Sequence, residues 1–249
     1  MEELIKIKDL CVEYRAGDVV AKAVNKLDLI IHKGEALGLV GESGAGKTTT
    51  ALSIMGLLPE KIGFVTSGEI TLNGISLLTM KEKDLNKIRG KKISMVFANP
   101  LTSLNPVFPI GHQITMVIRK HQRVSEKEAS EMAAKMLNLV GISSDRMDSY
   151  PHEISGGQRQ RVGIAAALIC NPELMIADEP STALDVTIQA QILELMKKLQ
   201  KEFSSSLLMI THNLGIIAEL CQRVAIMYGG EIVEDGKVRE VFQNPKHWY

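Results

Sequence analysis

Short apolar runs recur along the chain and predict buried strands, because a strand covered on both faces of a parallel sheet is apolar throughout. The clearest runs occupy residues 27–31, 36–40, 174–177 and 207–210. Between the last two runs, apolar residues return every three or four positions and predict a helix with one buried face. These residues are Ile188, Ile192, Leu195 and Leu199. Such an alternation of strands and helices is typical of an α/β protein.

Other segments predict surface strands and hairpins. Residues 5–8 alternate between apolar and polar side chains, as a half-buried strand does. Residues 68–74 have the pattern of a surface strand that ends in an Asn-Gly turn, which is a favoured hairpin turn. Residues 224–233 carry Gly229-Gly230 in their middle and predict a closing hairpin.

The middle of the chain has a different pattern. Residues 99–109 contain three prolines and cannot form regular helix or strand throughout. Ser125 and Glu128 then form a capping-box pattern, which is followed by helically spaced apolar residues and a stop at Gly141. We therefore expect a mainly helical insert with the hinge loop at 98–170, between core parts at 1–97 and 171–249.

The composition excludes several classes of protein. The 249 residues are 45% hydrophobic, which excludes intrinsic disorder, and the 29 basic residues balance the 29 acidic ones. A net charge of zero gives no general attraction to nucleic acid. No apolar run reaches the length of a membrane span, and the first residues do not resemble a signal peptide. The cysteines, at 11, 170 and 221, are too scattered to predict a zinc site or a disulfide framework.

The strongest chemical signal is the segment Gly41-Glu-Ser-Gly-Ala-Gly-Lys-Thr48, which matches the P-loop pattern between a predicted strand and a predicted helix. In such a loop, backbone N–H groups and the helix N-terminus hold phosphate, the lysine reaches the β- and γ-phosphates, and the threonine hydroxyl ligates Mg²⁺. The alternative is an ordinary glycine turn before a helix. The candidate ATP-binding residues are Gly41, Ser43, Gly44, Ala45, Gly46, Lys47, Thr48 and Thr49.

Two later segments add candidates. The apolar run at 174–177 ends in Asp178, a candidate Mg²⁺ ligand through water, and Glu179, a candidate general base for the attacking water. Alone, this pattern also fits a solvated strand end. The segment Ser155-Gly156-Gly157-Gln158 opens a helical run and predicts a second anion site, with a simple capped helix start as the alternative.

The order of these motifs resembles that of ATP-binding-cassette (ABC) ATPases over essentially the whole chain. The resemblance implies a P-loop (RecA-like) core with an N-terminal antiparallel β subdomain and an inserted helical subdomain. It makes residues 181–185 a D-loop that ends in Asp185. It also makes His212 a γ-phosphate contact, active with Glu179 and Lys47, and Tyr14 the ring that stacks on adenine. Taken singly, Tyr14 fits core packing and His212 a structural loop.

Further segments resemble the ATPase subunits of dipeptide, oligopeptide and nickel importers. They are residues 99–106, with Gly111 and Gln113 after them, residues 150–157, and residues 241–247. The resemblance implies binding of ATP and Mg²⁺ and head-to-tail pairing with a second cassette, identical or homologous. It further implies that the chain lies at the cytoplasmic face of the membrane, bound to two transmembrane permease subunits. An extracytoplasmic solute-binding protein would act indirectly, and no nucleic acid partner is expected.

Two departures from the family pattern keep alternatives open. Phe97 is followed by Ala98, where the family has a glutamine that contacts Mg²⁺ and the water side of the γ-phosphate. We expect ATP binding to survive, with slower hydrolysis or poorer coupling, and an ATP-gated module with impaired hydrolysis stays open. Peptide-importer relatives also continue beyond Tyr249, so this sequence suggests either a short, nickel-type member or a trimmed chain. A soluble, non-transport ABC ATPase is a further alternative, although that class usually has two cassettes or a long coiled-coil insertion.

Overall fold

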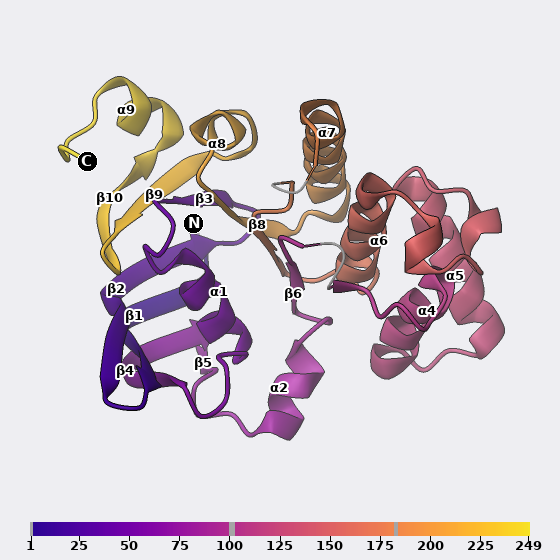
Figure 1. Cartoon of the computed structure of the whole chain (residues 1–249), viewed down its shortest axis with the longest axis horizontal. Helices are drawn as coiled ribbons and strands as arrows, with labels where there is room; N and C mark the ends of the chain where they lie inside the picture. Colours follow the sequence, from indigo (N-terminus) through magenta and orange to yellow (C-terminus); the bar gives the residue numbers. More distant parts are fainter. Residues whose placement is uncertain (1, 100–102, 182–183) are drawn as a thin grey trace. The chain divides into compact units, whose positions relative to one another are not determined.

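The computed structural model describes residues 2–99, 103–181 and 184–249. The chain forms two compact units, one of residues 1–86 with 206–249 and one of residues 87–205. The first unit combines an antiparallel sheet with a mainly parallel one, and the second combines two parallel strands with a group of helices (Figure 1). The α/β fold class predicted from the sequence is confirmed.

The antiparallel sheet has the strand order β2-β1-β4-β5. Its strands are β1 (Glu3–Ala16), β2 (Val19–His32), β4 (Gly63–Leu72) and β5 (Ile75–Ser76). The predicted Asn73-Gly74 turn joins β4 to β5, with both residues at positive φ. β1 and β2 are longer than their apolar patterns indicate, because their pairing continues into exposed ends at residues 15–16 and 19–22.

In the first unit, the second sheet has the strand order β10-β9-β3-β8. Its strands are β3 (Ala36–Val40), β8 (Ser206–Thr211), β9 (Arg223–Tyr228) and β10 (Glu231–Lys237). β3 pairs in parallel with β8 and β9, and β3 and β8 are buried at every residue, which explains their uninterrupted apolar runs. The predicted closing hairpin is the antiparallel pair β9–β10. The helices of this unit are α1 (Lys47–Met55), α8 (Leu214–Leu220) and α9 (Val238–Gln243).

The second unit holds the parallel pair β6 (Ile93–Val96) and β7 (Leu174–Asp178). Its helices are α4 (Ile110–His121), α5 (Glu126–Leu139), α6 (Gly156–Leu168) and α7 (Val186–Phe203), with single 3₁₀ turns at Ser144–Arg146 and Pro151–Glu153, and α2 (Glu82–Ile88) crosses the boundary between the units. The predicted capping box of Ser125 and Glu128 starts α5, and Gly141, with φ +78°, follows its end. Helices α4, α5 and α6 pack against one another (Figure 1).

The two units are the two compact parts of the chain. The boundaries at 97 and 170 were instead predicted from the positions of the sequence motifs, and they differ from the boundaries of the compact units. That three-part division stays a prediction. Among the described residues, no helix combines the length and the apolar character needed to cross a bilayer.

Candidate functional site

The candidate P-loop, residues 41–48, leaves the end of β3 and enters α1, as the sequence predicts. Gly46 caps α1 with φ +105°, and Gly44 has φ +82°. Both angles lie in the left-handed region that glycine adopts without steric cost. The loop therefore curls back on itself directly before the helix.

Two glycines of the loop lie against neighbouring backbone. A Cβ atom on Gly41 would lie 2.1 Å from the carbonyl oxygen of Met227 in β9. A Cβ atom on Gly46 would lie 2.3 Å from the carbonyl oxygen of Ala23 in β2. These oxygens belong to backbone and cannot move aside as a flexible side chain does. The backbones of β9 and β2 therefore pack directly against the loop and leave room only for glycine at positions 41 and 46.

The loop leaves backbone donors available at the N-terminus of α1. Among the described residues, no acceptor receives the N–H groups of Gly46, Thr48 and Thr49, whereas the N–H of Ala45 donates to the carbonyl of Glu42 at 3.1 Å. A row of such donors, together with the positive end of the helix dipole, forms an anion site. This arrangement suits the phosphates of a nucleotide.

The side chains around the loop have different surroundings. Lys47 is buried, and its Nζ donates to the carbonyls of Gly41 at 2.7 Å and Glu42 at 2.8 Å, so the ammonium group spans the loop. The side chain of Thr48 is exposed, as that of Ser43 is. The buried Thr49 has its hydroxyl 3.2 Å from the Tyr14 hydroxyl, so β1 brings the candidate adenine-stacking ring to the first turn of α1.

His212 directly follows β8 and is exposed. Because Thr211 is paired with Val40, His212 and Gly41 leave neighbouring strands at the same edge of the sheet. Asn213 then caps α8 by accepting the N–H groups of Gly215 and Ile216, which fixes the loop that carries the histidine. The sequence analysis missed this cap, although asparagine before an apolar helix is a recognised signal for one.

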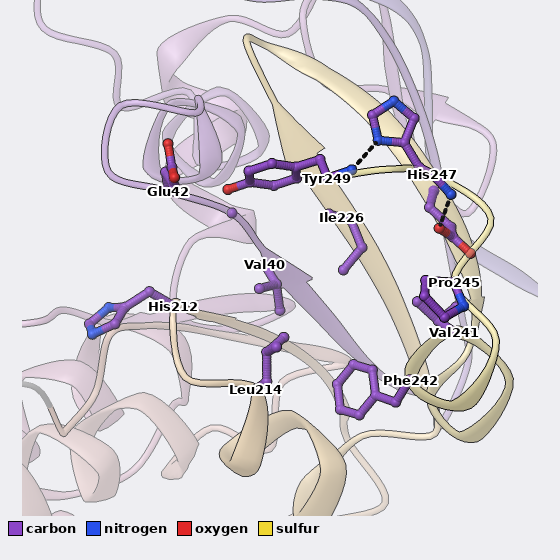
Figure 2. Close-up of a pocket in the computed structure, with 12 residues that line it drawn as sticks. Val40, Glu42, His212, Leu214, Ile226, Val241, Phe242, Pro245, His247 and Tyr249 are labelled. Atoms are coloured by element: carbon purple, nitrogen blue, oxygen red, sulfur yellow. Dashed lines mark hydrogen bonds between the residues drawn. The ribbon is translucent and has the colours of Figure 1, made fainter.

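A cavity of about 630 Å³ lies beside the P-loop, lined by Gly41, Glu42 and His212 and by residues of the C-terminal segment (Figure 2). Most of its other lining side chains are apolar, and Figure 2 shows Tyr249 pointing toward Glu42. Tyr14, Lys47 and Thr48 are not in its lining. The cavity therefore adjoins the phosphate-binding loop and shares Gly41 and His212 with the candidate nucleotide site.

Residues 244–249, which we name the terminal hook, form one wall of this cavity. The Glu234 carboxylate accepts the backbone N–H groups of Lys246, at 3.0 Å, and His247, at 2.9 Å. These hydrogen bonds, that of His247 foremost, hold the pKa of Glu234 below its usual value. The Tyr249 ring packs against Tyr228 with centroids 4.7 Å apart.

In the second unit, the paired candidate carboxylates stand at the end of β7. Asp178 is the last residue of the strand and is buried, with an exposed fraction of 5%. Glu179 follows it with φ +47°, a left-handed conformation that costs an L-residue about 1–2 kcal/mol. Strain of this kind is concentrated at functional sites, and here it sets the direction in which the Glu179 side chain leaves the strand.

The segment Ser155–Gln158 starts α6. Ser155 is the N-cap, and Gln158 returns its side-chain oxygen to the Ser155 N–H at 3.0 Å, which completes a capping box. A Cβ atom on Gly157 would lie 2.6 Å from Cγ2 of Ile188, so this glycine permits close packing of α6 on α7. Gly156 is partly exposed, and a Cβ atom on it would lie 3.5 Å from Cδ2 of Leu184, which is an ordinary contact distance. The capped helix start is thus real, and the exposed Ser155 stands at its tip.

Asp185 caps α7 by accepting the N–H of Ile188 at 3.0 Å. Within the predicted D-loop, residues 182 and 183 lie outside the described residues, as do residues 100–102 of the proline-containing segment. Ala98 follows β6 after Phe97 and is partly exposed.

The structure brings together part of the predicted site. The first unit contains Tyr14, the P-loop residues from Gly41 to Thr49, and His212. The second unit contains Ser155–Gln158, Asp178, Glu179 and Asp185. In the described residues, no group of three or more metal-ligating His, Cys, Asp or Glu side chains is present.

Comparisons with known proteins agree with these observations. The family model described as "ABC transporter" matches residues 24–182. A putative peptide import ATP-binding protein of Brucella melitensis is 52% identical over 100% of this chain and 75% of its own length. The oligopeptide transport ATP-binding protein OppD of Bacillus subtilis is 49% identical over 99% of this chain and 69% of its own length.

Among solved structures, the dimeric post-hydrolysis state of the ATP-binding cassette MJ0796, bound to ADP and Pi, is similar to this chain with a TM-score of 0.84. Its sequence identity is 29%, and the match covers 95% of this chain and 99% of that one.

Proposed function

The chain belongs to the ABC transporter family and is an ATPase of that family, and we propose that it is the motor subunit of a peptide importer. The observation that carries the proposal is the P-loop, whose N–H donors, glycines and Lys47 form a phosphate site at the N-terminus of α1. Sequence identity of about 50% to named peptide import ATP-binding proteins supports the transport role.

In this proposal, the first unit holds the nucleotide. The Tyr14 ring stacks on the adenine, and the N–H groups of Gly46, Thr48 and Thr49 bind phosphate oxygens. Lys47 exchanges its two carbonyl acceptors, on Gly41 and Glu42, for the β- and γ-phosphates.

The residues present fit Mg²⁺, which prefers hard oxygen ligands. The resemblance assigns the ligands to Thr48, whose side chain is exposed in the first unit, and to Asp178, which ends β7 in the second unit. When bound, the ion would neutralise charge on the phosphates. The Glu179 carboxylate accepts a proton from the attacking water, and His212 contacts the γ-phosphate.

The motifs Ser155–Gln158 and Asp185 act on a second cassette. This chain has one P-loop and one such segment, and the similar cassette MJ0796 was solved as a dimer. We infer head-to-tail pairing, in which the exposed N-terminus of α6 faces the γ-phosphate bound to the partner. ATP then stabilises the closed pair, and hydrolysis shifts the equilibrium to the open pair.

The transported solute and the membrane partners follow from the relatives. Their names specify peptides and oligopeptides, so we propose peptides in preference to nickel. Two permease subunits would bind the chain at the cytoplasmic face of the membrane, and an extracytoplasmic binding protein would deliver the solute. Ala98 removes an amide that a glutamine would supply, and we expect slower hydrolysis for this reason.

Co-purification and uptake test the proposal together. The chain is co-expressed with candidate permease subunits, extracted in detergent and reconstituted into vesicles with a peptide-binding protein. ATP-dependent peptide uptake that is lost with Lys47→Ala supports the motor role. A chain that purifies alone and binds nucleic acid with a steep salt dependence contradicts it.

A further inference from the structure

The turn between β9 and β10 lies directly against the P-loop. The Gly230 N–H donates to the carbonyl of Ala45 at 3.1 Å, and the Gly230 carbonyl accepts the N–H of Asn25 in β2 at 2.9 Å. The Asn25 side-chain amide also donates to the carboxylate of Glu231. Gly230 is therefore bonded on one side to the phosphate-binding loop and on the other to the antiparallel sheet.

The first of these hydrogen bonds fixes the orientation of one peptide group. In a planar trans peptide, the carbonyl and the N–H point in opposite directions. Because the Ala45 carbonyl points at Gly230, the N–H of Gly46 in the same peptide points away from the turn. Within the described residues this N–H has no acceptor. It is thus held available for a ligand by a contact on the opposite side of the loop.

We propose that Gly230 is a positioning residue for the nucleotide: its N–H holds the Ala45–Gly46 peptide so that the Gly46 N–H meets a phosphate oxygen. The inference rests on the proposed function of the P-loop. Met227, near the end of β9, supports the same loop, because its carbonyl oxygen lies beside Gly41 and its side-chain methyl group lies beside Gly46. The end of β9 and the following turn together hold the loop in place.

Two adjacent glycines provide a matched comparison. Gly229 and Gly230 both have positive φ, +57° and +88°, so alanine is strained at either position. A Cβ atom on Gly229 would meet nothing within 4 Å. A Cβ atom on Gly230 would lie 3.1 Å from the carbonyl oxygen of Ala23 and 3.2 Å from the N atom of Asn25, so the turn and β2 must separate by a few tenths of an ångström. Such a shift strains the hydrogen bond from the Gly230 N–H to the loop.

The test measures ATP and ADP affinity and thermal unfolding of the whole chain for wild type, Gly229→Ala and Gly230→Ala. We expect the affinity of Gly230→Ala for both nucleotides to fall about tenfold and that of Gly229→Ala to stay within about 1.5-fold of the wild type, with similar melting temperatures. Steady-state kinetics should place the Gly230→Ala effect mainly in KM, because the catalytic side chains are unchanged.

A third variant, Asn25→Ala, tests the inference even if Gly230→Ala fails to fold. It adds no atom and removes the side-chain bond to Glu231 that clamps the turn from outside. We expect a two- to threefold loss of ATP affinity at an unchanged melting temperature. The inference is overturned if Gly229→Ala and Gly230→Ala bind ATP with equal affinity, or if the loss in Gly230→Ala merely follows a lower melting temperature. If Gly230→Ala fails to fold, unchanged ATP affinity in Asn25→Ala overturns the inference. Failure of the wild type to bind ATP would instead overturn the proposed function.

Discussion

Replacing Gly41 by alanine should damage both the stability of the protein and its affinity for ATP. The new Cβ atom would lie 2.1 Å from the carbonyl oxygen of Met227, whereas carbon and oxygen atoms in close contact are about 3.3–3.6 Å apart. The backbones of the loop and β9 would therefore have to separate by about 1 Å. No side-chain rotation relieves the contact, because the oxygen belongs to the backbone. The pairing of Val40 with Ile226 also holds the two backbones together at this point.

The size of the effect follows from this geometry. Overpacking a rigid site costs about 1–3 kcal/mol, and each kcal/mol lowers the melting temperature of a chain of this size by about 2–4 °C. We expect a decrease of about 2–12 °C for Gly41→Ala, measured by calorimetry. ATP affinity, measured by titration calorimetry, should fall at least about tenfold, because the loop donors move with the backbone.

Gly44→Ala is the control in the same loop. Gly44 also has positive φ, at +82°, but a Cβ atom there would meet nothing within 4 Å. It should carry only the backbone strain of about 1–2 kcal/mol and retain most of the ATP affinity. The reasoning is refuted if Gly41→Ala binds ATP as tightly as the wild type and melts no lower than Gly44→Ala.

Three further outcomes are expected. Tyr14→Ala should weaken ATP binding about tenfold through lost stacking, whereas Tyr14→Phe, which loses only the 3.2 Å contact with Thr49, should stay within about threefold in the same titration. Ala98→Gln should raise Mg²⁺-dependent ATP turnover severalfold, and equal turnover would mean that this amide is dispensable for the chemistry. The terminal hook should loosen as the pH falls through the lowered pKa of Glu234, below the usual glutamate range, because protonation weakens the hydrogen bonds that the charged carboxylate accepts from His247 and Lys246. The fluorescence of Trp248, the single tryptophan, reports this loosening, and Glu234→Gln should lack the acid transition.

Much of the fold could be predicted because the local signals agree with the tertiary structure. The apolar runs at 36–40 and 207–210 became fully buried strands, and the pattern at 224–233 became the β9–β10 hairpin. The P-loop lies where its motif requires, between β3 and α1. These features depend on neighbouring residues and on burial, which sequence patterns record well.

Features that depend on pairing between distant segments could not be predicted. The length of β1 and β2 comes from antiparallel pairing that continues through the exposed residues 15–16 and 19–22, which no buried apolar pattern marks in the sequence. The bond from Gly230 to Ala45 joins residues far apart in the chain, and the sequence showed Gly230 only as a turn residue. Glu179 gave no sign of its positive φ, because that angle is imposed by its surroundings and is not a preference of glutamate.

The measurement that tests the central claim most directly is Mg²⁺-dependent ATP hydrolysis by the wild type and by Glu179→Gln, with ATP affinity measured on the same samples. We predict that Glu179→Gln binds ATP with wild-type affinity and turns it over at least about 100-fold more slowly, because the general base is lost. Wild-type turnover in Glu179→Gln would contradict the assignment of the base. Absence of ATP binding in the wild type would contradict the account of the P-loop as a nucleotide site.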